Sequence, residues 1–145
     1  MLTGTFARSV DEKQRIAIPK RLRDALELGE PAELFIAPGT DGSLTIYTQR
    51  SLEAFASRLA AASPTQQDVR AFNRLFYAQI ERVELDAQGR IRIPPALAQL
   101  AHIEREAVLL GVQDHLELWD QQRWDQYLAA RRDQYDALAE RALGE

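Results

Sequence analysis

DAQGRIRIP, residues Asp86–Pro94, repeats a segment that the chain carries once before. Residues Asp11–Pro19 have the sequence DEKQRIAIP and match it at an offset of 75 residues. In both copies an aspartate stands four residues before an arginine, and a short Ile-x-Ile-Pro run follows. The match continues to Leu22 in the first copy and to Leu97 in the second. A charged turn followed by a short apolar strand is therefore the repeated unit of this chain.

The polarity of the first copy alternates, which predicts a strand. Ile16 and Ile18 would share one face of it, and Arg15 would lie on the other. Pro19 ends the strand and suits the first turn of a helix, because its missing N–H has no partner to lose there. The second copy follows the same pattern after a strand at 83–85.

Each copy continues into a short helix and then a hairpin. Apolar residues at helical spacing predict the first helix over 20–28, with Gly29 as its stop. The turn of the second hairpin is three residues shorter than that of the first, so its last strand matches at an offset of 72. The expected hairpin strands are 33–37 and 43–47 in the first copy, and 107–112 and 116–119 in the second.

Helical spacing also marks the segments between and after the copies. Residues 51–61 predict one connecting helix, and the stripe of apolar residues after Pro64 predicts a second. The pattern resumes at Asp120 and continues to about residue 143, which predicts a helix on the order of 35 Å long. A core this small does not need so long a helix, so we expect it to pack on a neighbouring subunit.

We expect an α+β fold of two tandem repeats related by a pseudo-twofold axis. A unit of about 40–45 residues is too small to bury a sufficient core alone, so the two copies would complete each other. This pairing would bring both Asp-x-x-x-Arg turns to a common surface. The expected segments are residues 1–50 and 81–124 for the repeats, 51–80 for the helical connector and 120–145 for the C-terminal helix.

Composition limits the function classes. The 145 residues include no cysteine and only two histidines, so we expect no metal site and no cofactor. No apolar run is long enough to span a bilayer, which favours a cytoplasmic protein without a membrane partner. The net charge is −4, yet residues 1–23 contain six basic and two acidic residues, a local charge of +4.

The Asp-x-x-x-Arg turn has two interpretations. The aspartate could hold the arginine in one orientation, as recognition of guanine or phosphate requires, and alternation would place Arg92 on the face of Arg90. Alternatively, each pair is a solvated salt bridge that closes a hairpin and contributes under about 1 kcal/mol. A duplicated fold would also duplicate its salt bridges, so recurrence leaves both open.

Other residues favour structural roles. We expect His102 at a helix end and His115 in a turn, and solvated helix faces for the arginine pairs at 70/74 and 131/132. The sequence contains no phosphate-binding glycine loop, no Ser-His-Asp set and no paired buried carboxylates, so we expect no enzymatic activity and no small-molecule substrate. The aromatic residues expected in the core or in oligomer contacts are Trp119, Trp124, Tyr127 and Tyr135.

The order and spacing of these segments resemble the MraZ family. The resemblance rests on the two signatures, on RAFNRLF at 70–76, and on Leu110-Gly111 followed by LELW at 116–119. It covers about residues 4 to 127. It implies two SpoVT/AbrB-type swapped-hairpin domains with a β-barrel core. It also implies a sequence-specific, DNA-binding transcriptional regulator that binds tandem short repeats in the promoter of its own division and cell-wall gene cluster. Such a regulator would be associated with the nucleoid and would form a ring-shaped homo-oligomer.

By match of motif, the resemblance implies that Arg15 and Arg90 contact double-stranded DNA and that Asp11 and Asp86 orient them. Lys13 would contact a base or a phosphate. Together with the basic segment 8–23, the expected DNA-contact residues are Arg8, Lys13, Arg15, Lys20, Arg21, Arg90 and Arg92. The rival hypothesis is a non-catalytic protein-interaction or antitoxin-like assembly module whose arginine turns bind an acidic partner.

Two departures from the family pattern affect these expectations. Gln14 stands where glycine is expected in the first signature, which predicts a looser turn and a differently aimed Arg15. Pro95-Ala96 replaces the basic pair Lys20-Arg21 at the start of the second helix. We therefore expect the first repeat to supply most of the electrostatic attraction and Arg15 most of the recognition, with the second repeat serving assembly as well.

Overall fold

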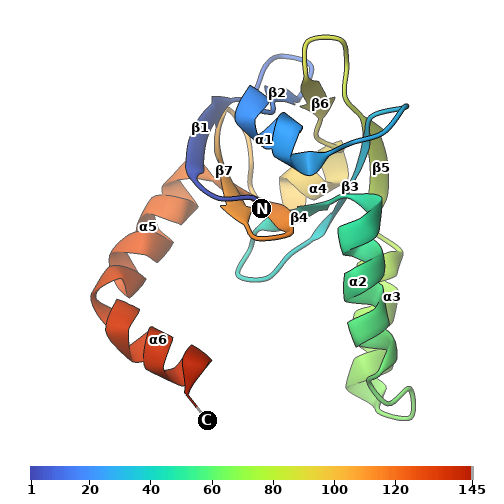
Figure 1. Ribbon diagram of the computed structural model, residues 1–145, viewed down its shortest axis with the longest axis vertical. Coiled ribbons are helices and arrows are strands. Elements are labelled where there is room, and N and C mark those ends of the chain that lie inside the picture. Colours follow the sequence, from blue (N-terminus) through green and yellow to red (C-terminus); the bar gives the residue numbers. More distant parts are fainter. Residues whose placement is uncertain (145) are drawn as a thin grey trace.

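The two repeated strands pair with each other in the computed structural model, which describes residues 1–144 (Figure 1). Strand β2 (Arg15–Ala17) runs antiparallel to β6 (Arg90–Arg92), and Ile16 lies directly opposite Ile91. Both isoleucine side chains are almost completely buried. Because these two residues are equivalent in the repeat, the pseudo-twofold axis passes between them. We refer to this two-stranded element as the ribbon.

The other strands form a six-stranded antiparallel sheet in the order β1-β7-β8-β4-β3-β5. This order is itself symmetric about the β8–β4 pair: β1, β3 and β4 of the first repeat correspond to β5, β7 and β8 of the second. The strands are β1 (Thr5–Ser9), β3 (Glu33–Pro38), β4 (Leu44–Tyr47), β5 (Glu81–Glu84), β7 (Glu106–Val112) and β8 (His115–Asp120). The structure thus confirms the expected α+β fold of paired repeats.

The repeats exchange their first strands. Strand β1 pairs with β7 of the second repeat, and β5 pairs with β3 of the first. Strand β1 is absent from the sequence-based prediction, because its residues do not alternate cleanly in polarity. The exchange has a thermodynamic consequence: neither hairpin has a complete sheet until the other repeat is folded, so the two repeats share one core.

The core lies between the ribbon and the sheet. Ile16 and Ile91 belong to the same apolar cluster as Leu34, Ile46 and Leu118 of the sheet, all with almost no exposed surface. Within residues 1–144, β1 and β5 are the edges of the sheet and do not pair with each other. The core expected as a barrel is therefore closed by packing of the ribbon over the sheet.

A short helix follows each ribbon strand. Helix α1 (Lys20–Leu26) follows β2, and α4 (Pro95–Leu100) follows β6. Helix α1 ends earlier than the predicted stop at Gly29, because Glu27 adopts a left-handed conformation with φ of 52°. His102, the equivalent residue after α4, has φ of 57°. The same ending in both repeats shows that their backbones are alike beyond the matched sequence.

The connector is a pair of helices that projects from the body of the molecule (Figure 1). Helix α2 (Gln49–Ala60) is capped by Thr48, whose side chain accepts a hydrogen bond from the backbone N–H of Ser51. Helix α3 (Gln67–Tyr77) packs Phe76 against Phe55 of α2, with ring centroids 5.1 Å apart. Both predicted connecting helices are thus present.

The C-terminal segment is helical to Leu143 and leaves the body on the side opposite the connector (Figure 1). It is divided into α5 (Gln121–Arg131), a 3₁₀ turn over Arg132–Gln134 and α6 (Tyr135–Leu143). The expected single helix is thus interrupted, and the interruption lies beyond the last residues that pack on the sheet. No helix in the described chain is long and apolar enough to cross a membrane.

Candidate nucleic-acid interface

Asp11 organises the first signature turn through both of its carboxylate oxygens. Oδ1 accepts hydrogen bonds from the backbone N–H groups of Lys13 at 2.9 Å and Arg15 at 2.8 Å. Oδ2 accepts from Nε of the Arg15 guanidinium at 2.8 Å. A single side chain therefore closes the turn and fixes the direction of the arginine.

Asp86 makes the same three contacts in the second turn. Its Oδ1 accepts from the backbone N–H groups of Gln88 at 2.9 Å and Arg90 at 3.0 Å, and its Oδ2 from Arg90 Nε at 2.9 Å. In each turn the backbone N–H of the arginine, followed by its side chain, lowers the pKa of the aspartate below its ordinary value of 3.8. Both carboxylates are therefore ionised at neutral pH, which keeps the arginines anchored.

The prediction about Gln14 is wrong. Gln14 has φ of 64° and Gly89, its equivalent, has φ of 76°, so both turns have the same left-handed residue at the same place. The backbone N–H of Gln14 donates to the carbonyl of Asp11, as that of Gly89 donates to Asp86. The hydrogen bonds of the aspartate compensate for the strain of a non-glycine residue, so Arg15 is aimed as Arg90 is.

Gln14→Gly is expected to stabilise the protein. A non-glycine residue in the left-handed region costs about 1–2 kcal/mol, and the greater freedom of glycine in the unfolded chain offsets about 0.4–1 kcal/mol of that gain. The expected increase in the free energy of unfolding is therefore centred on about 0.8 kcal/mol and at most about 1.6 kcal/mol, measured by urea denaturation. The reciprocal change, Gly89→Gln, should destabilise. Equal stability of Gln14→Gly and the wild type would contradict the strain at this position.

Acid is expected to weaken the two turns. Because both aspartate pKa values are lower in the folded protein than in the unfolded chain, their contribution is complete above about pH 4 and is lost as the pH falls through the lowered folded values. The double variant Asp11→Asn, Asp86→Asn should therefore be less stable than the wild type near pH 7, with a difference that shrinks toward pH 3. Urea denaturation across that range measures it, and a pH-independent difference would contradict the assignment.

The ribbon brings three arginines onto one outer face. Arg15 lies directly opposite Arg92, and Arg90 lies opposite Ala17, while Ile16 and its partner point into the core. The prediction that Arg90 and Arg92 share a face is therefore confirmed. The side chains of Arg15 and Arg90 are each 29% exposed, and Arg92 is exposed. The two signatures form one surface, as the pseudo-twofold fold requires.

The remaining predicted contact residues belong to the first repeat and differ in exposure and in their partners. Lys13 is exposed in the first turn, and Lys20 forms an exposed ion pair with Asp24 at 2.9 Å. Arg21 donates to the carbonyl of Thr3 at 3.0 Å and lies over the ring of Phe6, so it is fastened to the N-terminal segment. Arg8 belongs to β1, where alternation places it on the face of Phe6. Contact of these residues with DNA stays a prediction.

One basic residue of the interface is missing from the sequence-based list. Arg23 of α1 lies against Gly89, where a Cβ atom added to the glycine would stand 2.7 Å from Nε and Cζ of the arginine. The basic helix of the first repeat therefore lies beside the turn of the second repeat. Arg23 therefore lies at the turn of the other repeat, and the expectation that the first repeat supplies most of the electrostatic attraction stays a prediction. The sequence signal that could have indicated this is the repeat itself, because two equivalent strands related by a twofold axis pair antiparallel.

The histidines and aromatic residues lie outside the ribbon. Nδ1 of His115 is 2.8 Å from Asp114, and its Nε2 is 3.9 Å from Glu117; the carboxylate of Glu117, followed by that of Asp114, raises the pKa of His115. Residues 1–144 contain no group of His, Cys, Asp and Glu that could hold a metal ion.

The aromatic cluster of the C-terminal segment is Trp119, Trp124 and Tyr127. Tyr135 lies outside it and is 75% exposed, so it is not part of the core of this chain, and its alternative role in an oligomer contact stays a prediction.

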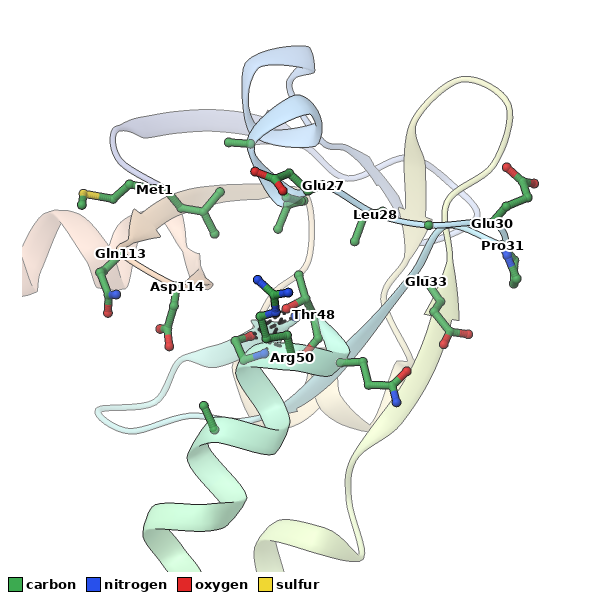
Figure 2. A pocket seen from close by; sticks show the side chains of 17 residues that line it. Met1, Glu27, Leu28, Glu30, Pro31, Glu33, Thr48, Arg50, Gln113 and Asp114 are labelled. Carbon is green, nitrogen blue, oxygen red and sulfur yellow. Dashed lines mark hydrogen bonds between the residues drawn. The ribbon is translucent and has the colours of Figure 1, made fainter.

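A groove with a volume of about 800 Å³ lies away from the signature turns. It is bordered by the end of α1, the start of α2 and the β7–β8 turn. Figure 2 shows four carboxylates around it, those of Glu27, Glu30, Glu33 and Asp114, against one labelled guanidinium, that of Arg50. This excess of negative charge makes the groove unsuitable for a nucleic acid.

Comparison with known proteins agrees with the repeated architecture. Residues 1–75 and 76–145 each match the family model described as "MraZ protein, putative antitoxin-like". The chain belongs to the MraZ family. The resemblance inferred from the two signatures is therefore confirmed, and the match of each half to the same MraZ model agrees with the duplicated strand order of the sheet.

Similar MraZ proteins carry the name "Transcriptional regulator MraZ". The protein of Moorella thermoacetica is 36% identical over 143 residues, covering 99% of this chain and 97% of the relative. That of Rhodococcus jostii is 37% identical over 145 residues, covering 100% and 99%. That of Thermomicrobium roseum is 37% identical over 124 residues, covering 86% and 84%. The similarity to MraZ proteins therefore extends over nearly the whole chain.

Proposed function

We propose that this protein is a sequence-specific DNA-binding transcriptional regulator whose ribbon is the DNA-contact surface. The observation that supports it best is the pair of signature turns, in which Asp11 and Asp86 hold Arg15 and Arg90 on one outer face. The names of the similar MraZ proteins favour the same role. The assignment makes the protein a binding protein without catalytic activity.

The geometry of the arginines suits base recognition. Each aspartate engages Nε of its arginine and so does not occupy the two terminal nitrogens. Two such nitrogens match O6 and N7 of guanine, which face the major groove. That groove admits a two-stranded β-ribbon. Arg15 and Arg90 would therefore contact bases while the sheet stays outside the groove.

Phosphate contacts would come from the basic side chains around the ribbon. Lys13, Lys20 and Arg92 are exposed and close in the chain to the base-contacting arginines. Each lysine or arginine that neutralises a phosphate releases counterions, so the affinity should fall steeply as the salt concentration rises. These contacts would position the ribbon without selecting a sequence.

Assembly of several chains would match several short DNA sites. Helix α3 exposes Phe72, Leu75 and Tyr77, and α6 exposes Tyr135 and Leu138, which are apolar surfaces of the kind used in protein contacts. We propose a homo-oligomer, ring-shaped as the family resemblance implies. It would bind tandem promoter repeats of its own division and cell-wall gene cluster at the nucleoid. Once one ribbon is bound, the next site is filled at a high effective concentration.

The test is a footprint of the purified protein on the DNA upstream of its own gene. We expect protection of short direct repeats, with an affinity that decreases as salt increases and that is lost on scrambled DNA. A gel-shift titration at several salt concentrations provides the affinity. Absence of protection, or equal affinity for scrambled DNA, would contradict the proposal.

The family description "antitoxin-like" favours a second candidate, a protein-interaction module whose arginine turns bind an acidic partner. The two functions differ in one measurable property. A module that binds only protein would show no salt-sensitive binding to its upstream DNA, whereas the regulator would.

A further inference from the structure

Antiparallel pairing in the ribbon joins each signature turn to the strand end of the other repeat. The backbone N–H of Ile18 donates to the carbonyl of Gly89 at 2.9 Å. The equivalent bond runs from the N–H of Ile93 to the carbonyl of Gln14 at 2.8 Å. Each end of the ribbon therefore combines the turn of one repeat with residues that follow the turn of the other.

At the end of the ribbon that contains the second turn, the side chain that comes from the first repeat is Arg23. Its side chain is partly buried, and its Nε donates to the carbonyl of Ile18 at 2.9 Å. The side chain lies against Gly89, the residue before Arg90, and its atoms are the nearest to the position that a Cβ of residue 89 would take. Arg23 is thus held at the turn that presents Arg90 and not at the turn of its own repeat.

The end that contains the first turn has a different composition. The equivalent of Arg23 is Ala98, which is buried and apolar. The second repeat instead contributes Arg92, which lies opposite Arg15 and whose own equivalent is Ala17. The two ends therefore present different pairs of arginines on one symmetric backbone.

We propose that the ribbon binds DNA through two unequal half-sites, each composed of both repeats. Arg15 with Arg92 forms one half-site, and Arg90 with Arg23 forms the other. A chain with two different half-sites has a direction on DNA, so it binds an asymmetric sequence in one orientation. This inference rests on the proposed function, and it identifies Arg23 as an additional DNA-binding residue.

Double-mutant cycles test the composition of the half-sites. Kd values for upstream DNA would be measured by fluorescence anisotropy for Arg23→Ala, Arg92→Ala, Arg15→Ala and Arg90→Ala, alone and in pairs. We expect Arg23→Ala to weaken binding several-fold in the wild-type background. In the Arg90→Ala variant the same change should weaken binding less. In the Arg15→Ala variant it should weaken binding as much as in the wild type. Arg92→Ala should show the reverse dependence.

Arg23→Ala removes the hydrogen bond to Ile18 and could cause a folding defect. Arg92 is exposed, so the cycles that contain Arg92→Ala test the proposal independently of such a defect. Coupling within each repeat, Arg23 with Arg15 and Arg92 with Arg90, would overturn the proposal. Additive effects in all four pairs of Arg23 or Arg92 with Arg15 or Arg90 would also overturn it. Absence of binding by the wild type would instead reject the proposed function itself, together with this inference.

Orientation on DNA provides a second measurement. The chain contains no cysteine, so single cysteines at the equivalent, exposed positions Glu12 and Ala87 can each carry an iron chelate that cleaves nearby DNA. We expect each label to cleave at one end of every direct repeat, and the two labels to cleave at opposite ends. Cleavage by each label at both ends equally would overturn the proposal, because it would show binding in both orientations.

Discussion

Arg15→Ala combined with Arg90→Ala is expected to abolish sequence-specific DNA binding while the protein stays folded. Each base-contacting arginine contributes about 1–3 kcal/mol, so the double variant should lose about 2–6 kcal/mol per bound chain. This corresponds to between roughly thirty-fold and more than ten-thousand-fold weaker binding. The fold should persist because both side chains lie on the outer face of the ribbon, outside the core.

The matched control is Arg132→Ala combined with Arg141→Ala, which removes the same charge from exposed positions in the C-terminal segment. Gel-shift titrations on upstream and scrambled DNA would compare both variants with the wild type. The control should keep the sequence preference. Retained affinity and preference in the Arg15, Arg90 variant would show that the signature turns are structural salt bridges, the alternative that the sequence leaves open.

Ile91→Ala is expected to destabilise the whole chain by about 2–5 kcal/mol. Ile91 is 1% exposed and lies at the pseudo-twofold axis, opposite Ile16 and within the core shared by both repeats. Removing its side chain leaves a cavity that the surrounding strands can fill only in part. Because the repeats exchange strands, we expect one cooperative unfolding transition in urea, shifted to lower concentration, and not the separate unfolding of one repeat.

Ile91→Val is the graded control and should cost only about 0.5–1.5 kcal/mol, since it removes one methylene group. Ile16→Ala should resemble Ile91→Ala, because the two positions are equivalent across the axis. A cost below that of the valine variant, or two resolved transitions, would contradict a shared core.

Local features of the structure follow closely from the sequence. The 75-residue repeat, the alternation around Ile16 and Ile91 and the helical spacing of the connector predict elements that the structure contains. Contacts between residues four positions apart are also local, so the link from Asp86 to Arg90 could be predicted from spacing alone. The resemblance to the MraZ family rested on these signatures together with RAFNRLF at 70–76 and the segment from Leu110 to Trp119, and the family match confirms it.

Predictions failed where a residue adopts a conformation that its type disfavours. Gln14 and Glu27 both have positive φ, although glycine is the usual residue there, so the first turn was expected to be loose and α1 to be longer. In both cases the tertiary structure repeats a backbone conformation that exists in the other repeat. Hydrogen bonds and packing around these residues outweigh a local preference of about 1–2 kcal/mol.

The two arginine turns, their strands and their duplication can be read from the order of the residues alone. The place of Arg23 depends on the tertiary fold: this residue of α1, in the first repeat, lies against Gly89 in the turn of the second. The physical reason is the direction of the strands. Distance along the chain associates α1 with Arg15, but antiparallel pairing of β2 with β6 carries it to Arg90.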